Sequence, residues 1–187
     1  MSALAWKIWC AVAVVGLSFV VVWRQSRATN AALAERASRP EALREAELVY
    51  MERLFRISNP VGLVAKLDRA YRMPSGLIVL VEFKTRWINQ SFLSDVIQLS
   101  AQRMVVMGQT RQAVVSYGYV MVKSPARCLP YAHRVKCLSN EEVIALVRRR
   151  EEVLAGRISP RGPSSANACR TCAFRVQCDR QINVADY

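Results

Sequence analysis

The sequence predicts an α/β fold, and three observations support that class. A turn at 74–76, rich in Pro and Gly, joins two strand-like runs into a hairpin over residues 68–84. Two further runs rich in β-branched and aromatic residues follow later in the chain. Segments with helical spacing of apolar residues lie before, between and after these strands. With 187 residues, the chain has room for one domain of ordinary size.

The first half of the predicted domain is a helix followed by the hairpin. Pro40 opens a segment over 40–57 in which apolar residues recur every three or four positions, which predicts an amphipathic helix. The strand at 61–72 leads to the turn, where Gly76 accepts a positive φ. The run 77–81 is apolar and short, as expected of a buried strand.

The second half of the predicted domain alternates helix and strand. Residues 91–107 have helical spacing, and 112–122 have the composition of a central strand. Residues 131–138 form a short predicted strand, and a capping box at 139–142 opens a helix over 141–155. The expected order is therefore helix, strand, strand, helix, strand, strand, helix.

An apolar run precedes this domain. Residues 8–23 carry no charge and are flanked by Lys7, Arg24 and Arg27. With the apolar residues before Lys7, the run approaches the roughly 20 residues of a membrane-spanning helix. The positive-inside rule then predicts a single-pass protein of the inner or cell membrane with its C-terminal domain in the cytoplasm. A signal peptide cleaved near 31–34 is the alternative.

The charge of the chain predicts a polyanionic partner. Lys and Arg total 27 against 14 Asp and Glu, a formal net charge of +13, and Arg supplies 22 of the 27 cations. Guanidinium groups match the geometry of phosphate. Nucleic acid is therefore the favoured partner, and an anionic lipid surface is the alternative.

Two carboxylates and a lysine are predicted to meet on the hairpin. If the turn centres on Ser75, residues whose numbers sum to 150 face each other, so Asp68 lies opposite Glu82. Lys84 points to the same face as Glu82. Because opposed carboxylates repel, this pairing favours a divalent cation such as Mg²⁺ between them, with Lys84 beside the reacting phosphate. The alternative is a surface salt bridge between Glu82 and Lys84, with Asp68 unrelated to it.

These residues resemble the core of a known enzyme family. An Asp, a turn and an apolar strand ending in Glu82-Phe83-Lys84 resemble the PD-(D/E)xK nuclease superfamily, and residues 80–85 are similar to its RecB-like branch. The resemblance implies a restriction-endonuclease-like mixed sheet flanked by helices, with Mg²⁺- or Mn²⁺-dependent hydrolysis of phosphodiester bonds. It also implies that Asp68, Glu82 and the backbone carbonyl of Phe83 bind the metal, and that Lys84 is the catalytic lysine.

The helix after the hairpin carries a partial match to the same branch. RecB-like nucleases have a glutamine there, with an aromatic residue four positions later. Gln98 fits the first position, and Gln102 occupies the second. Both glutamines share one helix face, where they are expected to contact the nucleic-acid backbone, and Gln98 is a candidate site residue. A polar stripe on a packed helix is the alternative.

A cysteine triad near the C-terminus predicts a metal centre. Cys169, Cys172 and Cys178 place three thiolates within ten residues, and a cytoplasmic location disfavours disulfides. The spacing is similar to that of iron–sulfur RecB-like nucleases, including the exonucleases of CRISPR adaptation, which implies a [4Fe–4S] cluster. Cys137 or Cys128 is the expected fourth ligand, and structural Zn²⁺ is the alternative occupant.

The expected organisation is a membrane anchor at 1–25, a linker at 26–39, a nuclease-like core at 40–158 and a cysteine segment at 159–187. The expected function is that of a membrane-anchored, metal-dependent (exo)nuclease acting on single- or double-stranded DNA. One alternative is a catalytically inactive nucleic-acid-binding module of the same fold, tethered to the membrane. Another is an exported protein stabilised by disulfides.

Overall fold

The computed structural model describes residues 3–126, 129–162, 168–169 and 172–178, and within the N-terminal helix it describes the side chains of residues 16–27, 29–30 and 32–37. The chain divides into two compact units, residues 1–140 and 141–187. The first unit holds the sheet and the candidate site, and each unit is described by itself.

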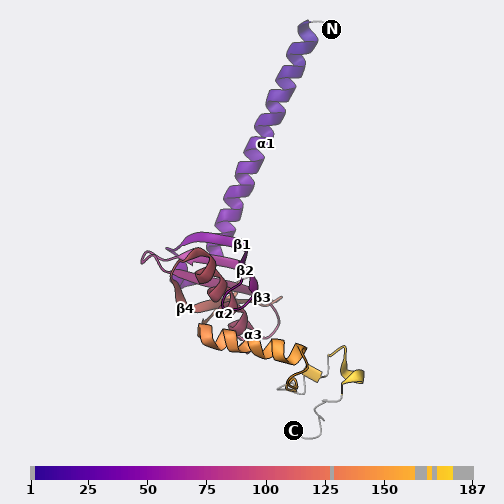
Figure 1. The fold of residues 1–187 in the computed structure, drawn as a ribbon. Helices are drawn as coiled ribbons and strands as arrows, with labels where there is room; N and C mark the ends of the chain where they lie inside the picture. Colours follow the sequence, from indigo (N-terminus) through magenta and orange to yellow (C-terminus); the bar gives the residue numbers. More distant parts are fainter. Residues whose placement is uncertain (1–2, 127–128, 163–167, 170–171, 179–187) are drawn as a thin grey trace. The chain divides into compact units, whose positions relative to one another are not determined.

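The first unit is built on a mixed sheet of five strands in the order β1-β2-β3-β4-β5. β3 and β4 are parallel, and the other neighbours are antiparallel. The helix α2 (Leu93–Thr110) connects the two parallel strands and contacts four strands of the sheet (Figure 1). This architecture agrees with the predicted fold class. The strands are β1 (Glu47–Ile57), β2 (Leu63–Arg72), β3 (Ile78–Thr85), β4 (Val114–Lys123) and β5 (Tyr131–Lys136).

The β2–β3 hairpin has the predicted turn and register. Gly76 N donates to Met73 O at 2.8 Å, and Gly76 adopts a φ of 83°, which glycine accepts without steric cost. The paired residues run from Arg72–Ile78 to Arg69–Val81, and the numbers in each pair sum to 150. The local turn chemistry therefore sets which residues of β2 and β3 lie side by side.

Apolar clusters lie on both faces of the sheet. On one face, Leu99 and Val106 of α2 pack with Leu80 and Val120 of the central strands. On the other, Leu43 of the short helix η1 (Glu41–Leu43) belongs to a second cluster. The strand members of that second cluster are Tyr71, Val79, Val81, Tyr119 and Met121. The alternation of Val79, Leu80 and Val81 between the clusters shows that β3 is buried on both sides.

The predicted helix at 40–57 is wrong over most of its length, because residues 47–57 form the strand β1. Phe55 is completely buried there and packs edge to face against Tyr50 at 5.1 Å. The Tyr50 hydroxyl donates to Gln112 Oε1 at 2.9 Å. Helical spacing of apolar residues is a weak signal, and antiparallel pairing with β2 overrides it.

The N-terminal helix α1 (Ala3–Ala37) is continuous for 35 residues and ends at the sheet (Figure 1). The Tyr71 hydroxyl donates to Glu35 Oε1 at 2.5 Å. Arg39 donates to both oxygens of Glu35, at 2.9 and 2.7 Å, and to Ala46 O at 2.7 Å. Burial and the hydrogen bond to Glu35 raise the pKa of Tyr71 to about 12. These contacts attach the end of α1 to the sheet.

The expected membrane-spanning helix at 1–25 is wrong, and so is the single-pass membrane localisation that followed from it. Within the described part of the chain, no helix combines the length and the apolar character needed to cross a bilayer. The side chains of residues 3–15 lie outside the described ones. From Gly16 onward, the helix continues without a break through Arg24 and Arg27 into the polar turns that bind the sheet. Residues 26–37, expected as a linker, belong to this helix.

The second unit contains most of α3 (Asn140–Leu154) and the short helix η2 (Arg175–Gln177). The helix predicted at 141–155 agrees with α3 to within one residue at each end. Gly156 follows it with a φ of 70°, and its N–H donates to Val153 O at 3.1 Å. The glycine therefore closes the helix as the sequence indicated.

Candidate active site

The candidate site lies where β2 and β3 stop pairing. Their ladder ends at Arg69–Val81, one pair before Asp68 and Glu82. Beyond it, Phe83 N donates to Asp68 Oδ2 at 2.8 Å, in place of a backbone partner on β2. The Asp68 carboxylate therefore lies at the edge of β3, beside the backbone that joins Glu82 to Lys84. Because the N–H and C=O of one strand residue point toward the same neighbour, the Phe83 carbonyl faces this edge too.

Glu82 is the buried centre of the site, with an exposed fraction of 3%. Its Oε1 accepts from Lys84 Nζ at 2.8 Å and from Gln98 Nε2 at 2.6 Å. Its Oε2 accepts from Gln102 Nε2 at 2.7 Å. An ionised carboxylate has about four acceptor positions, so these three donors leave one for a further ligand.

Lys84 joins the two elements of the site. Besides its ion pair with Glu82, its Nζ donates to Gln98 Oε1 at 2.7 Å. These two bonds use two of the three ammonium protons. The side chain is 27% exposed, against 4% for that of Glu82, so Lys84 lies between the buried carboxylate and solvent. The structure thus brings together Glu82, Lys84 and Gln98 through direct hydrogen bonds.

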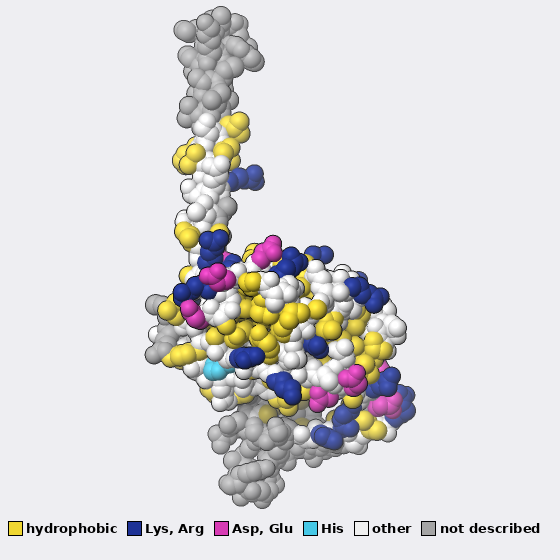
Figure 2. All heavy atoms as spheres, turned by 90° about the vertical axis from the view of Figure 1, so that its left-hand side faces the viewer, with side chains coloured by type: hydrophobic (Ala, Val, Ile, Leu, Met, Phe, Trp, Pro, Cys, Tyr) yellow, Lys and Arg dark blue, Asp and Glu magenta, His cyan; other side chains and the backbone are white. Residues whose placement is uncertain are grey.

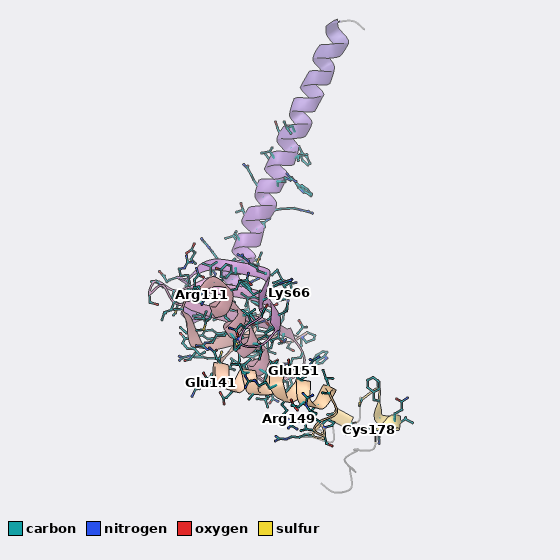
Figure 3. All side chains as sticks on the ribbon, in the orientation of Figure 1. Lys66, Arg111, Glu141, Arg149, Glu151 and Cys178 are labelled. Carbon is teal, nitrogen blue, oxygen red and sulfur yellow. The ribbon has the colours of Figure 1, made fainter. Side chains whose placement is uncertain are left out.

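Gln102, which the sequence placed on the same helix face as Gln98, is a further residue of the site. It is 1% exposed, and besides Glu82 its Nε2 binds Lys66 O at 2.9 Å. Lys66, labelled in Figure 3, lies on β2 two residues before Asp68. The Gln102 amide therefore ties α2 to both strands of the hairpin. Among the described atoms, its Oε1 has no hydrogen-bond partner.

Asp95 and Arg86 fix the start of α2, and no motif in the sequence pointed to either. Asp95 Oδ2 accepts from Phe92 N at 2.8 Å and from Arg86 Nη2 at 2.6 Å. Burial disfavours the charged form, but the bonds from Arg86 and Phe92 outweigh it and hold the pKa of Asp95 below its ordinary value. Because Gln98 lies one turn further along, this cap sets its position relative to Lys84. The acidic first turn of the helix was the available signal.

The described residues do not form the predicted cysteine cluster. Cys169 and Cys172 are free thiols in the second unit, which also holds Cys178, and Cys137 is a free, buried thiol in the first. No three His, Cys, Asp or Glu side chains in the described ranges are placed to hold a metal ion. Burial raises the pKa of Cys137, which disfavours the thiolate that a metal requires. Cys128 lies outside the described residues.

The positive charge is spread over the face of the molecule shown in Figure 2. On the face shown in Figure 2, Lys and Arg side chains are scattered among apolar and polar ones, with a few acidic groups between them. A net charge of +13 attracts a polyanion at long range, and the cations on this face do not define one groove.

Comparisons with known proteins identify a family. A family model described as the PD-(D/E)XK nuclease superfamily matches residues 4–179. No curated protein matches the chain. Similar solved structures include the protein SSO0001, which is 18% identical with a TM-score of 0.45 over 74% of this chain and 60% of that one. Another is a candidate exonuclease from Eubacterium rectale, 14% identical with a TM-score of 0.46 over 82% of this chain and 62% of that one. The chain therefore spans about three fifths of the length of these two proteins.

Proposed function

This chain belongs to the PD-(D/E)XK nuclease superfamily, and on that premise we propose that it hydrolyses DNA phosphodiester bonds with the help of a divalent metal ion. Asp68 and Glu82 would bind Mg²⁺ or Mn²⁺, Lys84 would act on the attacking water and the phosphate, and Gln98 would position Lys84. The observation that carries the proposal is the convergence of Lys84, Gln98 and Gln102 on the buried carboxylate of Glu82.

The residues present fit a hard cation. The ligands at this edge are oxygens: the carboxylates of Asp68 and Glu82 and the backbone carbonyl of Phe83. Mg²⁺ is commonly held by one or two carboxylates and keeps several waters, so two acidic side chains suffice. The three donors to Glu82 leave one of its acceptor positions for a cation. In Asp68, the Phe83 N–H binds Oδ2 and not Oδ1. When bound, such an ion polarises a phosphoryl oxygen and lowers the pKa of a coordinated water.

The protein's own groups supply the rest of the chemistry. Gln98 and Glu82 hold the Lys84 ammonium from two sides, so the ammonium has a fixed direction toward solvent. Its third proton is then available to a phosphate oxygen, where it stabilises the charge that grows during water attack. Gln102 keeps the Glu82 carboxylate in one orientation, because it donates to the oxygen that Lys84 does not use.

The decisive experiment compares isosteric variants on linear single- and double-stranded DNA with Mg²⁺ or Mn²⁺. We expect Glu82→Gln and Lys84→Met each to lower the cleavage rate by at least about 100-fold, the usual cost of losing a charge-stabilising group. Glu41→Gln is the matched control, because Glu41 is 79% exposed and its surface ion pair with Arg44 contributes little to stability. Circular dichroism would verify that each variant is folded.

The results distinguish a nuclease from a catalytically inactive nucleic-acid-binding module. A Glu82→Gln protein that cuts DNA at the wild-type rate would refute this active site. A wild-type protein that binds DNA but cuts it with neither metal would instead support the inactive binding module.

The RecB-like affiliation and the cysteine centre are finer predictions on the same premise. The spacing of Cys169, Cys172 and Cys178 supports both predictions. The described residues do not form such a cluster. Iron and zinc analysis of anaerobically purified protein, compared with a Cys172→Ser variant, decides the matter. Metal-free wild-type protein would remove the cluster from the proposal and leave the Asp68–Glu82 site untouched.

A further inference from the structure

The segment between β3 and α2 holds large apolar side chains out in solvent. Trp87 is 73% exposed, Ile88 59% and Leu93, at the start of α2, 69%. An indole gains much of its stabilising free energy from burial. Three large apolar side chains exposed within seven residues are typical of a surface that binds a partner.

Hydrogen bonds hold this segment in place. Arg86 N donates to Lys123 O at 3.1 Å, and the Arg86 guanidinium donates to Asp95 Oδ2 at 2.6 Å. Further along, Asn89 Oδ1 lies 2.8 Å from His133 Nε2 on β5. The residues on either side of Trp87 and Ile88 are thus tied to β4, β5 and α2. The indole is therefore presented by an ordered backbone.

The same segment joins the two elements that carry the candidate active site, β3 with Lys84 and α2 with Gln98. Trp87 follows Lys84 by three residues, so their Cα atoms are at most about 11 Å apart. Leu93 begins the helix that carries Gln98, and Gln98 is hydrogen-bonded to Lys84. A strand with a phosphate at Lys84 would therefore pass near the backbone that carries the indole.

We propose that Trp87, with Ile88 beside it, is a stacking site for an unpaired base of the nucleic acid whose phosphate lies at Lys84. This inference rests on the proposed nuclease function. An aromatic face stacks on a base of any sequence, and the net charge of +13 attracts the backbone that carries it. Because bases inside a duplex are already stacked on each other, this site selects single-stranded or frayed ends.

Fluorescence anisotropy of a labelled oligothymidylate, recorded in EDTA so that nothing is cut, tests the proposal with the full chain. We expect Trp87→Ala to weaken binding by about five- to 150-fold, the range of one base–aromatic stack, and Trp87→Phe to restore most of it. Phe174→Ala is the matched control, because Phe174 is a 70% exposed aromatic side chain in the other unit. An abasic oligonucleotide of the same length should bind wild type and Trp87→Ala equally.

The binding and size-exclusion measurements distinguish a stacking site at Trp87 from the alternatives. If Trp87→Ala binds the oligothymidylate like wild type while the protein cuts DNA, the stacking site is refuted and the nuclease proposal stands. If the wild-type protein binds no nucleic acid at all, the proposed function fails as well. If size-exclusion chromatography shows a dimer that Trp87→Ala turns into a monomer, with DNA binding unchanged, the exposed segment is a self-association surface and the inference is overturned.

Discussion

Gln102→Glu replaces an amide by a carboxylate of the same shape at the most buried point of the candidate site. In the folded protein, Gln102 Nε2 lies 2.7 Å from Glu82 Oε2 and 2.9 Å from Lys66 O. The substitution removes both donated bonds and brings a second carboxylate against the first. The pair escapes the repulsion by retaining one proton, which then bridges the two acids.

The size of the effect follows from the distance and from the ordinary pKa of Glu. Two full charges 2.7 Å apart repel by about 6 kcal/mol at an effective dielectric constant of about 20. Keeping one acid protonated at pH 7, against an ordinary pKa of about 4.3, costs about 3.7 kcal/mol at about 1.36 kcal/mol per pKa unit. Protonation is therefore the cheaper outcome. Loss of the bond to Lys66 O adds about 1 kcal/mol.

The penalty has a definite pH dependence. The folded-state pKa is raised above the unfolded one, so the variant loses stability as pH rises above about 4.3 and until it reaches the folded-state pKa. Between pH 5 and pH 7 the penalty should grow by about 2.7 kcal/mol.

Urea unfolding in EDTA at pH 5 and pH 7 measures this change. Gln109→Glu is the matched control, because Gln109 lies on the same helix and its Oε1 accepts from the exposed Arg56 N at 2.7 Å, a bond that a carboxylate keeps. We expect no comparable pH dependence in the control. A Gln102→Glu penalty that is the same at both pH values would refute the contact between residue 102 and Glu82 in the candidate site.

Three further substitutions test the supporting structure. Tyr71→Phe removes the hydroxyl that donates to Glu35 at 2.5 Å and should cost about 1.5–3 kcal/mol in thermal unfolding; no loss would mean that α1 does not bind the sheet there. Asp95→Asn should destabilise the protein at pH 7. Because the folded-state pKa of Asp95 is lowered, the difference in unfolding free energy from wild type should shrink as pH falls below about 4. A difference that is unchanged at acid pH would contradict the ion pair with Arg86. Gly118→Ala places a Cβ 3.0 Å from Leu80 O and 3.3 Å from Leu99 and should cost about 1–3 kcal/mol in urea unfolding, whereas a neutral effect would show that α2 packs less closely.

Features that depend on neighbours in the chain were predictable from the sequence. The turn at 74–76 and the alternation of side chains along β3 set the hairpin register. They also placed Glu82 and Lys84 on one face, where the structure shows them bonded. The helix α3 was likewise predictable from its capping residues and its closing Gly156.

Features that depend on distant parts of the chain were decided only by the tertiary structure. Residues 47–57 satisfy a helical pattern equally well, and only pairing with β2 and the burial of Phe55 make them a strand. The apolar run at 8–23 suggested a membrane anchor, yet it belongs to a helix that continues through charged turns to Glu35, which accepts from the Tyr71 hydroxyl. Gln102 occupies a position where related nucleases have an aromatic residue, and only the packing of α2 on the hairpin shows that it binds Glu82. In each case the outcome depends on contacts between residues far apart in the sequence. A local sequence pattern does not indicate which of these contacts has the lower free energy.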